Sequence, residues 1–219
     1  MSKRNNFNHK KITEPQNRHL LLLLYWIAYA VMYISFELFG NRNFHTISCP
    51  LDYKIPFCEF FFIPYFFWYV FLFGTVLYTL FFDIPNFKKI MYFIIISFTA
   101  AFFIYLIYPS VQNLRPNEFL RDNFFTDAVK ALYTVDTNTN VCPSIHVIGS
   151  MGVCFTLWNT KGFSSVIFRV LNVIITVLIC LSTVFLKQHS VVDLVLGVLI
   201  SIIVYPISLL IFKKQSVKR

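Results

Sequence analysis

The chain has 219 residues, of which 57% are hydrophobic and 13% are charged. Soluble globular proteins carry about 25% charged residues, and a soluble domain of this length has too little interior to hide so many apolar side chains. The composition therefore excludes disordered, coiled-coil, collagen-like and soluble two-domain proteins, and it indicates a protein of the lipid bilayer. The net charge of +9 predicts contact with anionic lipid headgroups rather than nucleic acid, because the basic residues lie between long apolar runs.

Six apolar runs approach the roughly 20 residues that a helix needs to cross the hydrocarbon core. The runs cover residues 20–40, 57–82, 90–108, 143–158, 164–186 and 191–212. They predict an all-α fold, a bundle of six transmembrane helices within a membrane domain at 20–212. The fourth run is the shortest, and it begins with polar residues. A basic segment at 1–19 and a basic tail at 213–219 flank the domain.

The distribution of charge predicts how the spans are oriented. The basic start resembles that of a signal peptide, but the apolar run after it is too long and lacks a small-residue cleavage site, so we expect an uncleaved anchor. With the amino terminus inside, the inner segments hold most of the 19 lysines and arginines, which predicts that both termini are cytoplasmic. The outer connections are then 41–56, 109–142 and 187–190. The long outer loop at 109–142 is expected to carry a short interfacial helix near 118–133.

Two histidines at the outer ends of predicted spans have polar neighbours, and the first is His189. It lies four residues before Asp193, so on a helix the two side chains share a face and can hydrogen-bond. An unpaired carboxylate is costly inside a membrane, and a carboxylate on Nδ1 of His189 leaves Nε2 as a nucleophile or base. The alternative is that the pair only satisfies two buried polar groups at a helix end.

The second histidine belongs to the sequence P-S-I-H, which runs from Pro143 through Ser144 to His146. Proline suits the first turn of a helix, and a serine beside the free N–H groups of that turn suits an anion, although a capped helix start explains both residues without a function. Arg115 is followed by proline after the third span. Its guanidinium suits bidentate binding of phosphate or contact with lipid headgroups.

Together these motifs resemble the type 2 phosphatidic acid phosphatase superfamily, whose pattern is K-x6-R-P, P-S-G-H and S-R-x5-H-x3-D at the ends of spans three to six. The motifs cover about 108–193, and the topology covers the whole chain. Tyr108 replaces the lysine, Ile145 the glycine and Thr183 the arginine of the pattern, so two cationic phosphate ligands are missing. The P-S-I-H variant is similar to the branch that contains inositol phosphorylceramide synthases. The candidates to supply the missing charge are Lys187, Arg121 and Lys130.

The resemblance implies a role for each motif residue, and neither a metal nor a cofactor is expected. The implied catalytic residues are His189, Asp193 and His146, and the implied substrate-binding residues are Arg115, Ser144 and Ile145. His189 would form a phosphohistidine while Asp193 orients its ring, and His146 would protonate the leaving oxygen and then activate water. Arg115 and Ser144 would stabilise the phosphoryl oxygens. Because His189 must be neutral and His146 protonated, the rate is expected to have a bell-shaped pH dependence.

Three functions are compatible with the sequence. The first is a metal-independent lipid phosphatase acting on a phosphate monoester or diphosphate, and the second is a transferase that passes the phosphoryl or phosphoalcohol group to a lipid alcohol. The third is a catalytically degenerate scaffold or lipid transporter, in which Glu37 and Glu59 of the predicted spans would be the functional groups.

The expected partners are a phosphorylated lipid and the membrane lipids, without nucleic acid and with no oligomeric state predicted. The very short loops favour a multi-pass protein of a bacterial cell membrane whose site faces outward. Three cysteines, Cys49, Cys58 and Cys142, lie on the predicted outer side, where oxidising conditions permit a disulfide among them.

Overall fold

The computed structural model describes residues 17–39 and 43–217. The basic segment predicted at 1–19 therefore lies mostly outside the described residues, and so does the end of the basic tail. The chain divides into two compact units, Met1–Gly40 and Asn41–Arg219. The first unit contains a 3-10 turn, η1 (Arg18–Leu23), that continues into the helix α1 (Leu24–Phe39).

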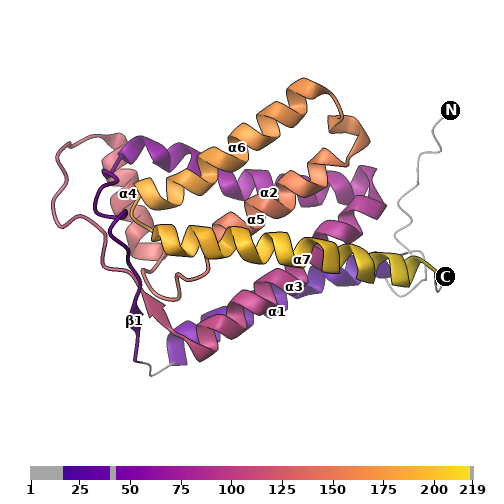
Figure 1. The fold of residues 1–219 in the computed structure, drawn as a ribbon, viewed down its shortest axis with the longest axis horizontal. Helices are drawn as coiled ribbons and strands as arrows, with labels where there is room; N and C mark the ends of the chain where they lie inside the picture. The colour runs from indigo at the N-terminus through magenta and orange to yellow at the C-terminus, as the bar shows by residue number, and fades with distance from the viewer. Residues whose placement is uncertain (1–16, 40–42, 218–219) are drawn as a thin grey trace. The chain divides into compact units, whose positions relative to one another are not determined.

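The second unit is built almost entirely from helices. These are α2 (Phe62–Phe82), α3 (Ile84–Ile107), α4 (Phe124–Val135), α5 (Ile145–Trp158), α6 (Val166–Phe185) and α7 (Val191–Val217), with the 3-10 turns η2 (Glu59–Phe61) and η3 (Lys161–Phe163). Two short parallel strands, β1 (His45–Thr46) and β2 (Ser110–Val111), join the first outer connection to the long loop. Figure 1 shows α4, β1 and the turn between α6 and α7 at the same end of the long helices. The loops that the sequence assigns to the outer side therefore gather at one end of this unit.

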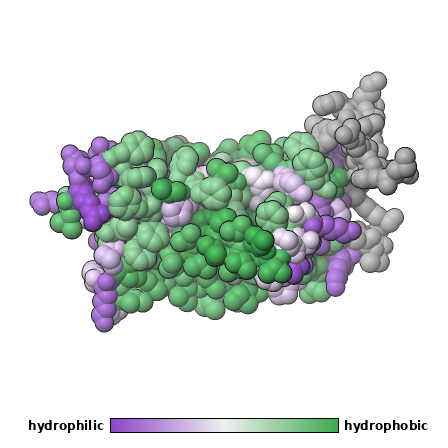
Figure 2. Space-filling model, turned by 90° about the horizontal axis from the view of Figure 1, so that it is seen from above, coloured by the Kyte–Doolittle hydropathy of each residue, from purple (hydrophilic) through white to green (hydrophobic). Residues whose placement is uncertain are grey.

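Within the described residues, five helical segments are long and apolar enough to cross a membrane. They are Arg18–Leu38, Glu59–Phe82, Ile84–Ile107, Val166–Phe185 and Val191–Lys214. These segments confirm a mostly helical, multi-pass membrane protein, and in Figure 2 hydrophobic side chains dominate the visible face. The fourth predicted span forms α5, whose 14 residues rise only about 21 Å, less than the ~30 Å of a hydrocarbon core. The count of six spans and their orientation stay predictions.

Side-chain caps set two helix starts that hydrophobicity alone misplaces. The third span is predicted to begin at residue 90, but α3 begins at Ile84, because the Asp83 side chain accepts a hydrogen bond from the Asn86 N–H and a proline occupies the first turn. The interfacial helix predicted at 118–133 is α4. It begins only at Phe124, because the Asn123 side chain caps two N–H groups of its first turn.

Helices α3 and α5 approach closely at Gly152, and this contact gives a prediction for stability. A Cβ at Gly152 would lie 2.6 Å from the ring of Phe93, which is only 2% exposed and cannot easily move away. We expect Gly152→Ala to lower the free energy of unfolding by about 1–3 kcal/mol, measured as the thermal midpoint in detergent. Gly74→Ala is the matched control, because nothing lies within 4 Å of its Cβ position and alanine favours a helix. A Gly152→Ala protein as stable as the wild type would contradict this packing.

Candidate active site

The turn between α6 and α7 places His189 at the start of the last helix. Lys187 adopts a left-handed backbone conformation with φ of 55°, which turns the chain back on itself. The N–H groups of Gln188 and His189 both donate to the carbonyl of Thr183, each at 3.0 Å. Helix α7 then begins at Val191. His189 is buried, with 7% of its surface exposed, like the rest of this turn.

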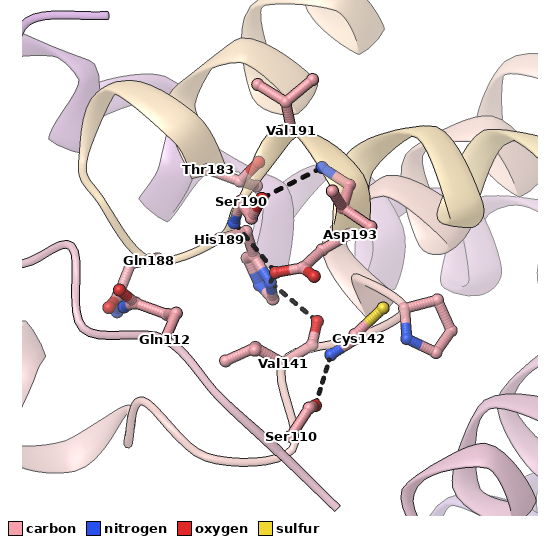
Figure 3. A network of polar contacts seen from close by, with 12 residues as sticks. Ser110, Gln112, Val141, Cys142, Thr183, Gln188, His189, Ser190, Val191 and Asp193 are labelled. Carbon is pink, nitrogen blue, oxygen red and sulfur yellow. Dashed lines mark hydrogen bonds and ion pairs between the residues drawn. The ribbon is translucent and has the colours of Figure 1, made fainter. Parts of the chain in front are cut away.

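The side chains of His189 and Asp193 are in contact, as their spacing predicts. Nδ1 of His189 lies 3.3 Å from Oδ2 of Asp193 and 2.9 Å from the carbonyl oxygen of Val141, as Figure 3 shows. Both neighbours of Nδ1 are acceptors, so the neutral ring carries its proton there. This tautomer leaves the lone pair on Nε2, the form of imidazole that acts as a nucleophile or base.

His146 lies beside this pair in the first turn of α5. Its ring packs between Tyr65 and Trp68 of α2, with ring centroids 4.4 and 4.3 Å away, and it lies 5.9 Å from the ring of His189. Among the described residues, neither ring nitrogen of His146 nor Oγ of Ser144 has a hydrogen-bond partner. Buried polar atoms are normally paired, so the hydrogen-bonding capacity of these three atoms is not used by the protein groups described.

Arg115 reaches the same region from the long outer loop. Its guanidinium donates to the carbonyls of Tyr133 and Asp136 at 3.1 and 2.5 Å, and to Oε1 of Gln188 at 2.5 Å. It also lies over the Tyr133 ring at 4.3 Å. Burial lowers the pKa of Arg115, against the opposing effect of Tyr133 and Asp136. Gln188 directly precedes His189, so this network ties the arginine to the turn that carries the histidine.

Arg115 from the long loop and His146 from the start of α5 thus lie beside the α6–α7 turn and the first residues of α7, which carry His189 and Asp193. The sequence pattern of the PAP2 superfamily matches residues 89–216, a range that includes all three motifs. The chain belongs to the PAP2 superfamily. A search of curated proteins and a search of solved structures each found no significant match. Membership indicates a lipid-type phosphatase or phosphotransferase, and the branch with inositol phosphorylceramide synthases stays a prediction.

Two residues of this PAP2 protein stand where the superfamily pattern has cations, and both have structural contacts. Tyr108 stacks on His45 with ring centroids 4.2 Å apart. Thr183 donates its hydroxyl to the carbonyl of Cys180, and its own carbonyl closes the α6–α7 turn. The third departure, Ile145, is the first residue of α5. Neither Tyr108 nor Thr183 replaces the missing positive charge.

The three basic residues considered as replacements are engaged elsewhere. Their partners are the carbonyls of Asp52 and Ile55 for Lys187, Glu59 for Arg121, and Asp127 and Asp122 for Lys130. In the part of the chain that the structure describes, Arg115 is thus the cation tied to the histidine pair. This PAP2 site is therefore less positively charged than the superfamily pattern implies.

The structure also shows the state of the cysteines and the arrangement of side chains that could bind a metal. All five cysteines are free thiols, so the structure contains no disulfide among Cys49, Cys58 and Cys142. Burial and the nearby carboxylate of Asp193 raise the pKa of the Cys142 thiol, which keeps that thiol neutral beside the histidine pair. Residues 17–39 and 43–217 contain no group of three His, Cys, Asp or Glu side chains placed to hold a metal.

Sequence reasoning missed several residues that support the PAP2 motifs. Tyr65 and Trp68 enclose His146, and the Tyr65 hydroxyl donates to Oδ2 of Asp136 at 2.5 Å. Gln188 accepts a hydrogen bond from Arg115, while its buried Nε2 has no partner within the described segments. The spacing of three between Tyr65 and Trp68 was the available signal, since it puts both on one face of a helix. In a chain that is 19% aromatic, this signal does not stand out.

Proposed function

We propose that this PAP2 protein is a metal-independent lipid phosphatase that hydrolyses a phosphate monoester or diphosphate lipid through a phosphohistidine at His189. The observation that carries the proposal is that Nδ1 of His189 faces two acceptors, Oδ2 of Asp193 and the carbonyl of Val141; these favour the tautomer that leaves Nε2 free to attack. The lone pair of Nε2 forms a bond to phosphorus as the bond from phosphorus to the leaving oxygen breaks. His146 donates a proton to that oxygen, then removes one from the water that releases phosphate.

The negative charge of the transferring phosphoryl group needs donors that are not already used. Oγ of Ser144, Nε of Arg115 and Nε2 of Gln188 are buried donors without partners in the described chain. Preorganised donors of this kind stabilise developing charge without reorganisation. We therefore assign substrate binding to Arg115, Ser144 and Gln188, with Ile145 beside them at the start of α5. The gathering of the polar loops at one end of the helices supports a site at headgroup depth, facing outward.

A head-group transferase is the second candidate, and the small number of cations favours it. A phosphodiester lipid carries one negative charge, whereas a phosphate monoester carries up to two. One guanidinium, already bonded to two carbonyls and Gln188, offsets the charge of a phosphodiester more completely. In this mechanism a lipid alcohol, rather than water, attacks the phosphohistidine. The degenerate scaffold has less support, because Glu59 accepts hydrogen bonds from Arg121 and Asn123 and so anchors the loop.

Phosphate release by the purified protein in detergent, with chelator present, tests the proposal. The substrates are phosphatidic acid, phosphatidylglycerol phosphate and undecaprenyl diphosphate, each also incubated with His189→Ala protein. We expect release that survives chelation and is absent from the variant. If a product forms only when a lipid alcohol is added to a phosphodiester lipid, the protein is the transferase. Activity of neither kind would leave the scaffold as the function.

A further inference from the structure

Asp52, in the first outer connection, is fully buried and bonded to the turn that carries His189. Its Oδ2 accepts from the Ser190 hydroxyl at 2.6 Å and from the Cys49 N–H at 2.7 Å, and its Oδ1 accepts from the Val191 N–H at 2.8 Å. Burial opposes ionisation, but these hydrogen bonds outweigh it and lower the pKa of Asp52. The carboxylate is therefore charged at neutral pH, and it caps the start of α7, where negative charge is favourable.

The same connection is bonded to the turn at two further points. Nζ of Lys187 donates to the carbonyls of Asp52 and Ile55, each at 2.6 Å. The N–H of Cys58 donates to the carbonyl of Phe185 at 3.1 Å. The connection is thus hydrogen-bonded to the end of α6, to the turn and to the start of α7. A shift of the connection would therefore shift the turn as well.

Ser190 transmits the position of Asp52 to the catalytic pair. Its hydroxyl donates to Asp52, and its backbone N–H donates to Oδ2 of Asp193 at 2.9 Å. That oxygen is the one that lies 3.3 Å from Nδ1 of His189. A shift of Ser190 away from Asp52 would therefore change how the Asp193 carboxylate meets the imidazole. No contact joins the Asp52 side chain to His189 itself among the hydrogen bonds of the described residues.

We propose that Asp52 is a positioning residue for the reaction, acting through Ser190 to hold Asp193 against the ring of His189. This inference rests on the proposed function, since it assigns Asp52 to the same chemistry. Outer-sphere partners that orient a reactive side chain are typically worth about 10–100-fold in activity or affinity in metal sites, where they have been measured most often. In this protein the carboxylate of Asp52 has the role of such an orienting partner, although it lies on a segment far from the motifs in sequence.

Asp52→Asn tests the inference with a side chain of nearly the same shape. Asparagine keeps one oxygen that can accept hydrogen bonds. Its NH₂ group replaces the other oxygen and cannot accept the hydrogen bond that this oxygen received in the wild type. We expect kcat to fall at least about tenfold with KM changed less than about twofold, because the substrate contacts are intact and the nucleophile is misaligned. Asp122→Asn is the matched control, since that side chain is 91% exposed, and it should leave both constants unchanged.

Ser190→Ala provides a second route that keeps Asp52 and its contact with Val191. This variant should lower kcat less than Asp52→Asn does, and the double variant should be no worse than Asp52→Asn, because both changes break the same link. It also keeps the test decisive if Asp52→Asn does not accumulate as folded protein. Hydrogen exchange of the peptide over 186–195 should be faster in both variants and unchanged in Asp122→Asn.

The inference is wrong if kcat is preserved in both variants, if KM rises in place of a fall in kcat, or if exchange over 186–195 does not change. Failure of the proposed function has a different signature. In that case the wild-type activity would be the same as that of His189→Ala, whereas failure of the Asp52 inference leaves the wild type active and Asp52→Asn equally active.

Discussion

Replacing His189 with alanine is expected to lower phosphate release or head-group transfer by at least about a thousandfold, because the variant cannot form the covalent intermediate. Because the ring is buried and its Nδ1 contacts the carbonyl of Val141, the stability of the variant has to be measured together with its turnover. The measurement is turnover under saturating lipid in detergent, with the thermal midpoint of each protein recorded beside it.

A phosphoenzyme trap separates a nucleophile from a residue that merely binds substrate. Acid-labile, alkali-stable label from a ³²P-lipid should accumulate on the wild type after rapid quenching and be absent from His189→Ala. His45→Ala is the matched control, because that histidine stacks on Tyr108 in the outer connection and has no part in the proposed reaction. Label that persists in His189→Ala would assign the nucleophile to another residue.

The apolar spans and the three motifs could be predicted from sequence because each depends on neighbours within one segment. Hydrophobic runs locate helices that face lipid, and five of the six predicted runs form segments long enough to cross a membrane. The contact between His189 and Asp193 is predicted from their spacing of four, although His189 lies in the turn just before α7 rather than on the helix. Hydrophobic patterns did not predict the first residue of a helix where a capping side chain sets it, as Asp83 does for α3 and Asn123 does for α4.

The support of the site could not be predicted, because it depends on contacts between segments far apart in the chain. Asp52 reaches Ser190 across 138 positions, and Lys187 reaches the carbonyl of Asp52 across 135. No periodicity or motif spacing links such pairs. In sequence, Lys187 is a free cation next to the histidine motif and so a candidate phosphate ligand. In the structure its ammonium group is used to hold backbone carbonyls, which removes that role.

His146→Gln is expected to reduce turnover by about 10²–10⁴-fold with a lipid whose leaving group is an alkoxide, because glutamine cannot supply the proton that the leaving oxygen needs. Glutamine suits the site better than alanine, since its flat amide can occupy the space between the Tyr65 and Trp68 rings that hold the imidazole. A thermal midpoint close to that of the wild type would show that the loss is chemical.

The dependence on the leaving group decides whether His146 acts as the acid. A lipid analogue that releases p-nitrophenolate needs little help from an acid, so His146→Gln should impair its cleavage by no more than about tenfold. Under the same conditions, His189→Ala should lose activity toward both substrates to the same extent, because the nucleophile is needed whatever group leaves. Equal losses with both substrates in His146→Gln would instead assign His146 to binding or positioning of the phosphoryl group. The two histidines therefore differ in a measurable way even though their rings are 5.9 Å apart.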